Sequence, residues 1–417
     1  MASKKNICVT NFDKDLTRYS RVNKEFISEL SKKFEKVYIL NLHNLRYIYK
    51  SKFKSIKKNQ KLLPKNFIII NIKNSKDFIN FSRNKTLTII LNGLTRSIID
   101  FKIHYLFKKV NAKLIMISIT GQWGTRILTD ISLRNIFVGR KHIIMKSFYY
   151  VYRILTILNF LPKINLLIES SAENIKAFNN GLSRKFESIF PIFKISLYRK
   201  IYHVNSKTFD ALYLSSKSKN NNSKGKKYIL YIDSPIDSDD RIQREGRVSL
   251  AIKNKYYKNL FSALNYISLK FKKKIIVSLH PSSIKSFDSI KKKFTKKLSH
   301  IAVSNQRTVD LIKDSSIVLF SMSSAVLNAV IFKKKIISLR SKYFGEYNLK
   351  INKKNTKGIN CPCINIDQQI KFTKSKINLD FKKSISSYDG IIKRRLTNGS
   401  NKPSFIEIVE ILKSGKF

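Results

Sequence analysis

Two short polar segments in the second half of the chain carry residues that can bind a phosphate group. His280 and Pro281 directly follow one apolar run, and Ser321, Ser323 and Ser324 follow another further along the chain. Imidazole and hydroxyl groups donate hydrogen bonds to phosphate oxygens, and free backbone amides at a helix start attract anions. A structural histidine or a helix-capping serine explains either segment alone, but their occurrence together favours a binding site.

Three carboxylates occupy loops that follow other apolar runs. Asp237 and Asp239 lie in the loop after residues 228–232, and Asp13 lies after residues 6–10. A carboxylate in such a position can act as a general base that takes a proton from an attacking hydroxyl. A solvated loop carboxylate explains each of them equally well, so the sequence leaves the identity of the base open.

The elements that must position these residues are short apolar runs that alternate with helical patterns. This alternation predicts parallel strands joined by helices, and thus an α/β fold with two Rossmann-like domains. In such a sheet, ligands bind outside the carboxyl ends of the strands, where the polar segments occur. The expected strands are 6–10, 37–40, 67–70, 87–91, 113–117, 164–170, 200–204, 228–232, 275–279, 301–303, 317–320 and 335–339. The expected helices include 22–34, 255–270, 283–298, 308–313, 324–332 and 403–412.

The segment 217–227 marks the expected domain boundary. It contains only Lys, Asn, Ser and Gly. This composition is typical of a solvated linker because it offers nothing to a hydrophobic core. We therefore expect an N-terminal Rossmann-like domain at 1–216 and a C-terminal domain at 228–417.

The chain is strongly basic: 83 Lys and Arg stand against 26 Asp and Glu, which makes the formal net charge +57. The residue usage of an AT-rich genome explains this excess, and so does an anionic partner such as a lipid headgroup, an acidic glycan or a nucleic acid. No helix-turn-helix, zinc or RNP-like pattern is present, so we expect no nucleic-acid partner. The basic aromatic stretch 136–161 predicts either a helix on an anionic membrane surface or a helix packed on the sheet.

The cysteines and the apolar runs indicate a cytoplasmic setting. Cys8, Cys361 and Cys363 cannot form a disulfide framework, and the last two are too closely spaced for a bridge or a CxxC zinc site. The N-terminal apolar run is too short for a signal peptide, and no run of about 20 uncharged apolar residues predicts a membrane span. We expect reduced thiols, no metal ion, and a location in the cytoplasm or at the inner face of its membrane. The absence of GxGxxG and GxxxxGK[ST] excludes a dehydrogenase and a P-loop NTPase.

Four segments of the second half, 229–235, 275–281, 310–325 and 334–339, resemble the bacterial sialyltransferase and polysialyltransferase-like glycosyltransferases. More broadly, they are similar to GT-B enzymes of capsule and lipopolysaccharide biosynthesis. The resemblance implies two Rossmann-like domains that face each other across a cleft. The acceptor domain would come first and the nucleotide-sugar domain second, and by analogy a terminal helix crosses back to the first. The family's acidic motif, two carboxylates before a glycine, is not cleanly present.

The resemblance implies transfer of a sialic-acid-like sugar from a CMP-sugar donor to a glycan or glycolipid acceptor. Such enzymes invert the anomeric centre by direct displacement and use no metal ion or cofactor. His280 would contact the CMP phosphate, Pro281 would shape that loop, and Ser323 and Ser324 would bind the phosphate from the helix end.

Two alternatives stay open at this point. Polyol-phosphate transfer of the teichoic-acid type also uses a histidine and paired serines near phosphate, and it would take a CDP-alcohol donor. A non-catalytic α/β scaffold that binds anionic glycan or lipid belongs to a different class. Nucleotide binding separates the scaffold from both transferases, because a transferase must bind its nucleotide.

Overall fold

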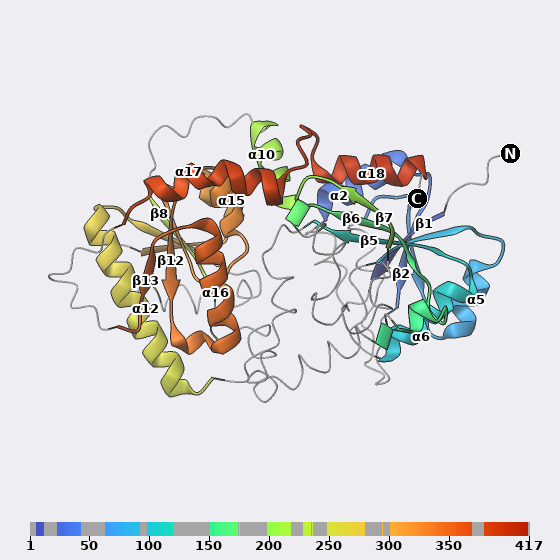
Figure 1. Ribbon diagram of the computed structural model, residues 1–417, viewed down its shortest axis with the longest axis horizontal. Coiled ribbons are helices and arrows are strands. Elements are labelled where there is room, and N and C mark those ends of the chain that lie inside the picture. Colours follow the sequence, from blue (N-terminus) through green and yellow to red (C-terminus); the bar gives the residue numbers. More distant parts are fainter. Residues whose placement is uncertain are drawn as a thin grey trace, which may run out of the picture. The chain divides into compact units, whose positions relative to one another are not determined.

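The computed structural model divides the chain into two compact units, whose helices and strands are drawn in Figure 1. The described residues are 6–11, 23–42, 63–91, 98–119, 151–175 without 153 and 174, 198–217, 228–236 without 235, 248–279, 294, 301–368 and 379–415. Among these, the first unit holds the chain up to Lys207 and again from Thr397 onward, and the second holds Thr208–Leu396. All but the first residue of the expected linker, 217–227, lie outside the described residues.

The first unit is built on a sheet of seven strands in the order β3-β2-β1-β4-β5-β6-β7. All of its strand pairs are parallel. Strand order moves outward from β1 in one direction and then from β4 in the other, as in the Rossmann fold. The strands are β1 (Asn6–Asn11), β2 (Val37–Asn41), β3 (Phe67–Asn71), β4 (Leu87–Leu91), β5 (Lys113–Ser118), β6 (Ile164–Glu169) and β7 (Tyr198–His203).

Helices cover both faces of this sheet because successive side chains of a strand point to opposite sides. Ile7 and Val9 of β1 pack with α2 and α18, whereas Cys8 between them packs on the other face with α5 and α6. The last helix, α18, therefore belongs to the core of the first unit and lies beside α2 (Figure 1). The helices are α2 (Lys24–Lys33), α5 (Ser75–Ser82), α6 (Ile98–Lys109) and α18 (Ser404–Ser414).

The second unit repeats the architecture with a sheet of six strands in the order β10-β9-β8-β11-β12-β13. Its pairs are again all parallel. The strands are β8 (Ile229–Ile232), β9 (Ile275–Ser278), β10 (Ile301–Ser304), β11 (Ile317–Phe320), β12 (Lys335–Arg340) and β13 (Cys363–Asn365). The helices are α10 (Lys207–Lys217), α12 (Leu250–Phe271), α14 (Thr308–Asp314), α15 (Val326–Ile331), α16 (Glu346–Ile359) and α17 (Lys382–Ile391), with the short helices η5 (Lys342–Phe344) and η6 (Ile392–Leu396).

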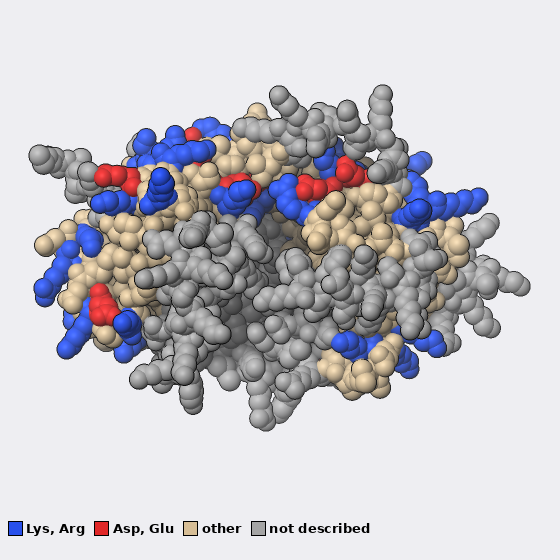
Figure 2. Space-filling model, turned by 180° about the vertical axis from the view of Figure 1, so that it is seen from behind, with Lys and Arg blue, Asp and Glu red and all other residues tan. Residues whose placement is uncertain are grey.

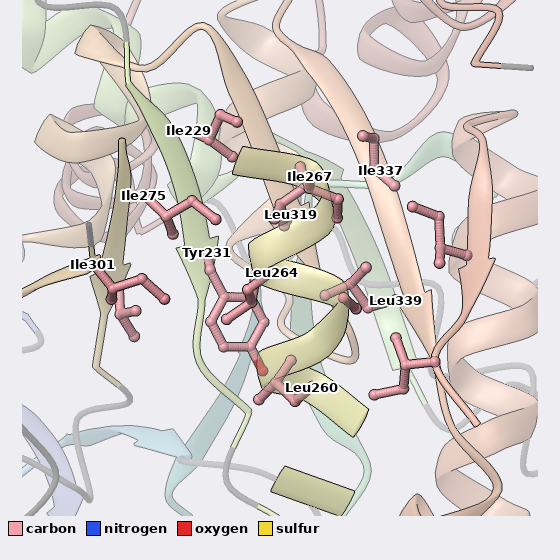
Figure 3. Packing of buried hydrophobic residues seen from close by; sticks show 14 of the residues in the cluster. Ile229, Tyr231, Leu260, Leu264, Ile267, Ile275, Ile301, Leu319, Ile337 and Leu339 are labelled. Atoms are coloured by element: carbon pink, nitrogen blue, oxygen red, sulfur yellow. The ribbon is translucent and has the colours of Figure 1, made fainter. Parts of the chain in front are cut away.

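The core of the second unit also alternates along each strand. Ile229 and Tyr231 pack with α12 on one face, and Leu230 and Ile232 pack with α14 and α15 on the other. Tyr231 points from β8 toward α12 and lies beside Leu264 (Figure 3). The α/β fold with two Rossmann-like domains, which the alternating pattern predicted, is thus confirmed.

The three cysteines are free thiols with different environments. Burial raises the pKa of Cys8 to about 12 and, with a smaller contribution from Cys363, that of Cys361 to about 12. Burial also raises the pKa of Cys363, which is only half-buried. The thiolate is the reactive form of cysteine, so a raised pKa and burial both slow its reaction.

We therefore expect an aromatic disulfide reagent at pH 8 to modify Cys363 well before Cys8 and Cys361 in the native protein. Native thiolate at Cys8 should appear only as the pH approaches about 12, the folded-state value. In denaturant, all three thiols should react at similar rates. The measurement is peptide mass spectrometry over a time course, and equal native rates for Cys8 and Cys363 would contradict the burial of β1.

No helix in the described part of the chain is long and apolar enough to cross a bilayer.

Candidate functional site

The second sheet has a topological switch point between β8 and β11. The chain leaves β8 toward β9 on one side and returns to β11 on the other, so the loops that follow β8 and β11 diverge at the carboxyl edge. Ile232 and Phe320, the last residues of the two strands, are partners in the register. Asp233 and Ser321 therefore begin two neighbouring loops, and this is where ligands bind in open parallel sheets.

The serine-rich turn after β11 presents its serines differently. Ser321 is fully buried, Ser323 is half-buried and Ser324 is exposed. The Ser323 hydroxyl accepts a hydrogen bond from the Ala325 amide at 3.3 Å, which forms a tight turn before α15. The helix accordingly begins at Val326, later than the residue 324 expected from the sequence. Ser324 is thus accessible from solvent, whereas Ser321 lies buried beneath the turn.

A buried amide connects this turn to a cation on the next strand. Asn352 of α16 is fully buried, and its Nδ2 donates to the Ser321 carbonyl, to Ser338 Oγ at 3.0 Å and to the Leu339 carbonyl at 3.3 Å. Its Oδ1 accepts from Arg340 Nε at 3.4 Å. Arg340 ends β12, which pairs directly with β11. The guanidinium of Arg340 thus lies at the carboxyl edge near the serine turn, where its charge can offset that of a phosphate.

The loop after β8 is held close to the serine turn. Asp233 and Ser234 are both buried. The Asp233 amide donates to the Ser278 carbonyl at 3.0 Å, and the Met322 amide approaches Ser234 Oγ at 3.5 Å. The carboxyl ends of β8, β9 and β11 are therefore linked by hydrogen bonds into one surface.

Two buried phenols lie beneath this surface. The hydroxyls of Tyr231 and Tyr256 are 3.5 Å apart. Burial raises the pKa of each well above its ordinary value, and the Asp233 carboxylate adds to both rises. Both phenols therefore stay protonated at neutral pH and belong to the same hydrophobic core cluster, of which Figure 3 shows Tyr231.

Five of the residues proposed from the sequence lie outside the described residues. They are His280, Pro281, Asp237, Asp239 and Asp13. In sequence, His280 is the second residue after β9, and Asp237 and Asp239 follow β8 by a few residues. The positions of His280, Asp237 and Asp239 in the chain are compatible with the carboxyl edge of the second sheet, whereas Asp13 follows β1 of the first sheet. The roles of all five residues stay predictions.

The carboxyl edge of the first sheet carries two polar residues whose pairing was not predicted from the sequence. Glu169 and His203 end β6 and β7 and are partners in the register. Glu169 is fully buried, and its Oε1 accepts from the Ser170 and Ser171 amides at 2.9 and 3.0 Å. His203 Nε2 lies 3.1 Å from the Ser170 carbonyl. In the sequence, Glu169 stands out as a carboxylate at the end of an apolar strand. Its hydrogen bonds to the Ser170 and Ser171 amides show that it stabilises the loop after β6.

Among the described residues, no group of His, Cys, Asp or Glu is arranged to hold a metal ion. The face shown in Figure 2 carries mostly Lys and Arg among its coloured charged side chains, with few Asp and Glu. This face therefore attracts anionic ligands.

Comparison with solved structures identifies the fold. The wall teichoic acid polymerase TagF matches with a TM-score of 0.53 and 15% identity, over 99% of this chain and 90% of that one. A candidate UDP-N-acetylglucosamine 2-epimerase from Listeria monocytogenes matches with a TM-score of 0.50 and 12% identity, over 100% and 97% of the two chains. The chain has the GT-B fold. At these identities the similarity establishes the fold alone.

A UDP-GlcNAc 2-epimerase from Methanocaldococcus jannaschii also matches this GT-B chain, with a TM-score of 0.47 and 15% identity, over 98% and 99% of the two chains. No protein-family model matches the sequence, and no curated protein matches it at a significant level. The assignment to GT-B therefore rests on structure, and the chemistry must be argued from the site.

Proposed function

We propose that this GT-B protein is a glycosyltransferase that binds a nucleotide-activated donor at the switch point of its second sheet. The observation that carries the proposal is that Asn352 connects Arg340, at the end of β12, to the Ser321 carbonyl of the serine turn after the adjacent strand β11, where Ser324 is exposed. A hydroxyl and a cation at one edge of a sheet fit the phosphate of such a donor. His280, which follows β9 in the sequence, adds a third group for the same phosphate.

The proposed reaction is a direct displacement. A hydroxyl oxygen of the acceptor forms a bond to the anomeric carbon of the sugar, and the bond from that carbon to the donor phosphate oxygen breaks. The nucleotide leaves with the bonding electrons, and a carboxylate takes the proton of the acceptor hydroxyl. Asp237, Asp239 and Asp13 are the candidates for this base, and Arg340 and His280 would stabilise the charge that develops on the leaving phosphate.

For the donor we propose a CMP-sugar of the sialic-acid type, on the resemblance of the second half to bacterial sialyltransferases. The acceptor would be a surface glycan or glycolipid, as in capsule or lipopolysaccharide synthesis, and the protein would act in the cytoplasm, in peripheral contact with the membrane. In this proposal the donor is a substrate, and neither a metal ion nor a cofactor takes part.

The similarity to the wall teichoic acid polymerase TagF favours a second candidate, transfer of a polyol phosphate from a CDP-alcohol. In that reaction the acceptor hydroxyl attacks phosphorus, and CMP leaves with the electrons of the broken phosphorus–oxygen bond. The same groups at the switch point would bind the donor, so the two candidates differ in the nucleotide that binds and in the group that is transferred.

Calorimetric titration with CMP, CDP, UDP and GDP tests the proposal. We expect binding that persists at high salt, which removes non-specific attraction of anions to this basic surface. Preference for CMP supports both candidates, because CMP leaves in each, and consumption of a CMP-sugar or of a CDP-alcohol then separates them. Preference for CDP supports the CDP-alcohol, and preference for UDP or GDP would replace the donor. The absence of salt-resistant binding would overturn the transferase and favour the non-catalytic scaffold.

A matched pair of variants on β12 localises the site. Arg340→Gln should lower the affinity for the preferred nucleotide by about tenfold, as expected for loss of one charge-assisted contact. Lys335→Gln removes a cation from the other end of the same strand and should leave the affinity within about twofold. Equal effects of the two substitutions would mean that binding follows overall charge and not the switch point.

A further inference from the structure

Five large apolar side chains are exposed together on the first unit. They lie on α6 and on a helical segment, residues 151–152 and 154–157, that leads through a turn into β6. We call them the apolar patch: Tyr105, exposed at 54%, Val151 at 42%, Ile154 at 39%, Leu158 at 56% and Phe160 at 59%. Single exposed apolar residues are ordinary, but a contiguous group of this kind marks an interaction surface.

Contacts between the two helical segments hold the patch together. Tyr152 stacks on Phe101 of α6 at 6.2 Å between ring centroids, and its hydroxyl lies 3.1 Å from His104 Nδ1. Lys108 donates to the Asn159 carbonyl. Tyr105 lies four residues after Phe101 and three before Lys108 in α6, so it shares their side of the helix.

The 151–158 segment is apolar on two sides. Tyr152 and Thr156 are buried and face the core. Val151, Ile154 and Leu158 are spaced by three and four residues, which places them in one stripe, and all three are exposed. A helix packed on the sheet needs only its inner stripe to be apolar, so the outer stripe indicates a second apolar partner.

Lysines lie on the two segments that carry the patch. Lys102, Lys109 and Lys163 are exposed. α6 contains Asp100 at its start, but residues 101–119 and 151–168 contain no Asp or Glu. A partner that offers an apolar interior beneath a negative surface complements both features, and a bilayer with anionic lipids is such a partner.

We propose that the apolar patch and its surrounding lysines bind the surface of a membrane that contains anionic lipids. A second copy of the chain fits less well, because self-association would bring lysines against lysines. A nucleic acid would use the lysines but has no place for an aliphatic stripe of Val, Ile and Leu. This surface follows from the first unit alone and does not depend on the proposed donor site of the second.

Flotation of the full chain with phospholipid vesicles tests the assignment. We expect binding to vesicles that contain one third phosphatidylglycerol and little binding to pure phosphatidylcholine, at physiological salt. Leu158→Ser with Phe160→Ser should lower the partition coefficient by about tenfold or more, since both apolar side chains leave the interface. Circular dichroism and nucleotide titration of the variant should match the wild type, which separates this result from failure of the proposed function.

The matched control removes two exposed leucines elsewhere. Leu250 and Leu269 are exposed at 73% and 68% at opposite ends of α12. A helix rises about 1.5 Å per residue, so they are too far apart to form a patch. Leu250→Ser with Leu269→Ser should change the partition coefficient by less than about twofold.

Three results would overturn the proposal. One is that the Leu158 and Phe160 variant binds vesicles as strongly as the wild type and that only salt weakens this binding, because charge alone would then explain it. Another is a concentration-dependent dimer in solution that this variant abolishes, because the patch would then bind a second copy. The third is binding of RNA or DNA that competes with the vesicles and is lost in the same variant.

Discussion

Asn205→Ala is expected to lower the free energy of unfolding of the first unit by about 2 to 4 kcal/mol, because four side-chain hydrogen bonds are lost around a buried residue. Asn205 is fully buried where the chain leaves the first unit. Its Nδ2 donates to the carbonyls of Ser400 at 2.8 Å and Lys402 at 2.5 Å. Its Oδ1 accepts from Thr397 Oγ1 at 2.7 Å and from the Asn398 amide at 3.0 Å.

These bonds fix the segment that returns from the second unit to the first. Glu407 of α18 completes the network, since its Oε2 accepts from the Asn205 amide at 2.8 Å and its Oε1 from Asn398 Nδ2 at 3.0 Å. Without Asn205, α18 would keep its apolar contacts with α2, but the segment that leads into α18 would lose its hydrogen bonds to the side chain of residue 205. Limited proteolysis should therefore cut the segment 397–403 faster in the variant, and urea unfolding should show the loss of stability.

Two further variants show whether the loss of stability comes from the hydrogen bonds of Asn205. Asn205→Asp keeps the size of the side chain but replaces the donor Nδ2 with an acceptor, so it should destabilise at least as much as alanine. Asn401 lies on the same segment and is exposed, so Asn401→Ala should change stability by less than about 0.5 kcal/mol. If Asn205→Asp unfolds like the wild type, the cost of Asn205→Ala comes from lost volume, and the hydrogen-bond network has no energetic role.

The strands that position the site could be predicted because burial on both faces makes them continuous apolar runs. The expected strands 228–232 and 317–320 correspond to β8 and β11 and end at the same residues, although β8 begins one residue later, at Ile229. The order of the strands in the sheet was harder to predict from the sequence. Only the fold shows that β8 lies next to β11, which brings their loops together.

Elements whose buried side is polar show no apolar pattern in the sequence from which they could be predicted. The helix α16 contributes Asn348, Asn352, Asn355 and Thr356 to the interior, so its sequence lacks the apolar period that indicates a helix. Sequence analysis assigned no element there, nor at β13 or α17. For the same reason the sequence did not indicate Arg340 as a candidate site residue, because Asn352 of α16 is what connects it to the serine turn.

The serine turn shows that the sequence of a single motif does not determine which of its residues are exposed. From sequence, Ser321, Ser323 and Ser324 were equivalent candidates for phosphate. Local hydrogen bonding separates them, because Ser323 accepts from Ala325 and the start of α15 moves to Val326. Burial of Ser321 depends on packing of distant segments, which no local pattern records.

His280→Ala is expected to lower turnover by about a hundredfold or more, the range for loss of a group that stabilises charge in a transition state. His280 follows β9, whose carboxyl end lies beside that of β8 at the edge with the serine turn. In the displacement proposed above, the imidazole donates to the departing phosphate. The loss should therefore appear mainly in kcat, measured as release of free nucleotide from the donor that the titration selects.

The matched control comes from the neighbouring strand. His300 is the residue immediately before β10, which is parallel to β9. A residue that precedes a parallel strand belongs to the opposite edge from one that follows its neighbour, so His300→Ala should leave kcat within about twofold. A folded His280→Ala protein with wild-type kcat, or equal losses in both histidine variants, would remove His280 from the site. Arg340 and the serine turn would then have to hold the donor phosphate without it, and the Arg340→Gln titration would report on that arrangement independently.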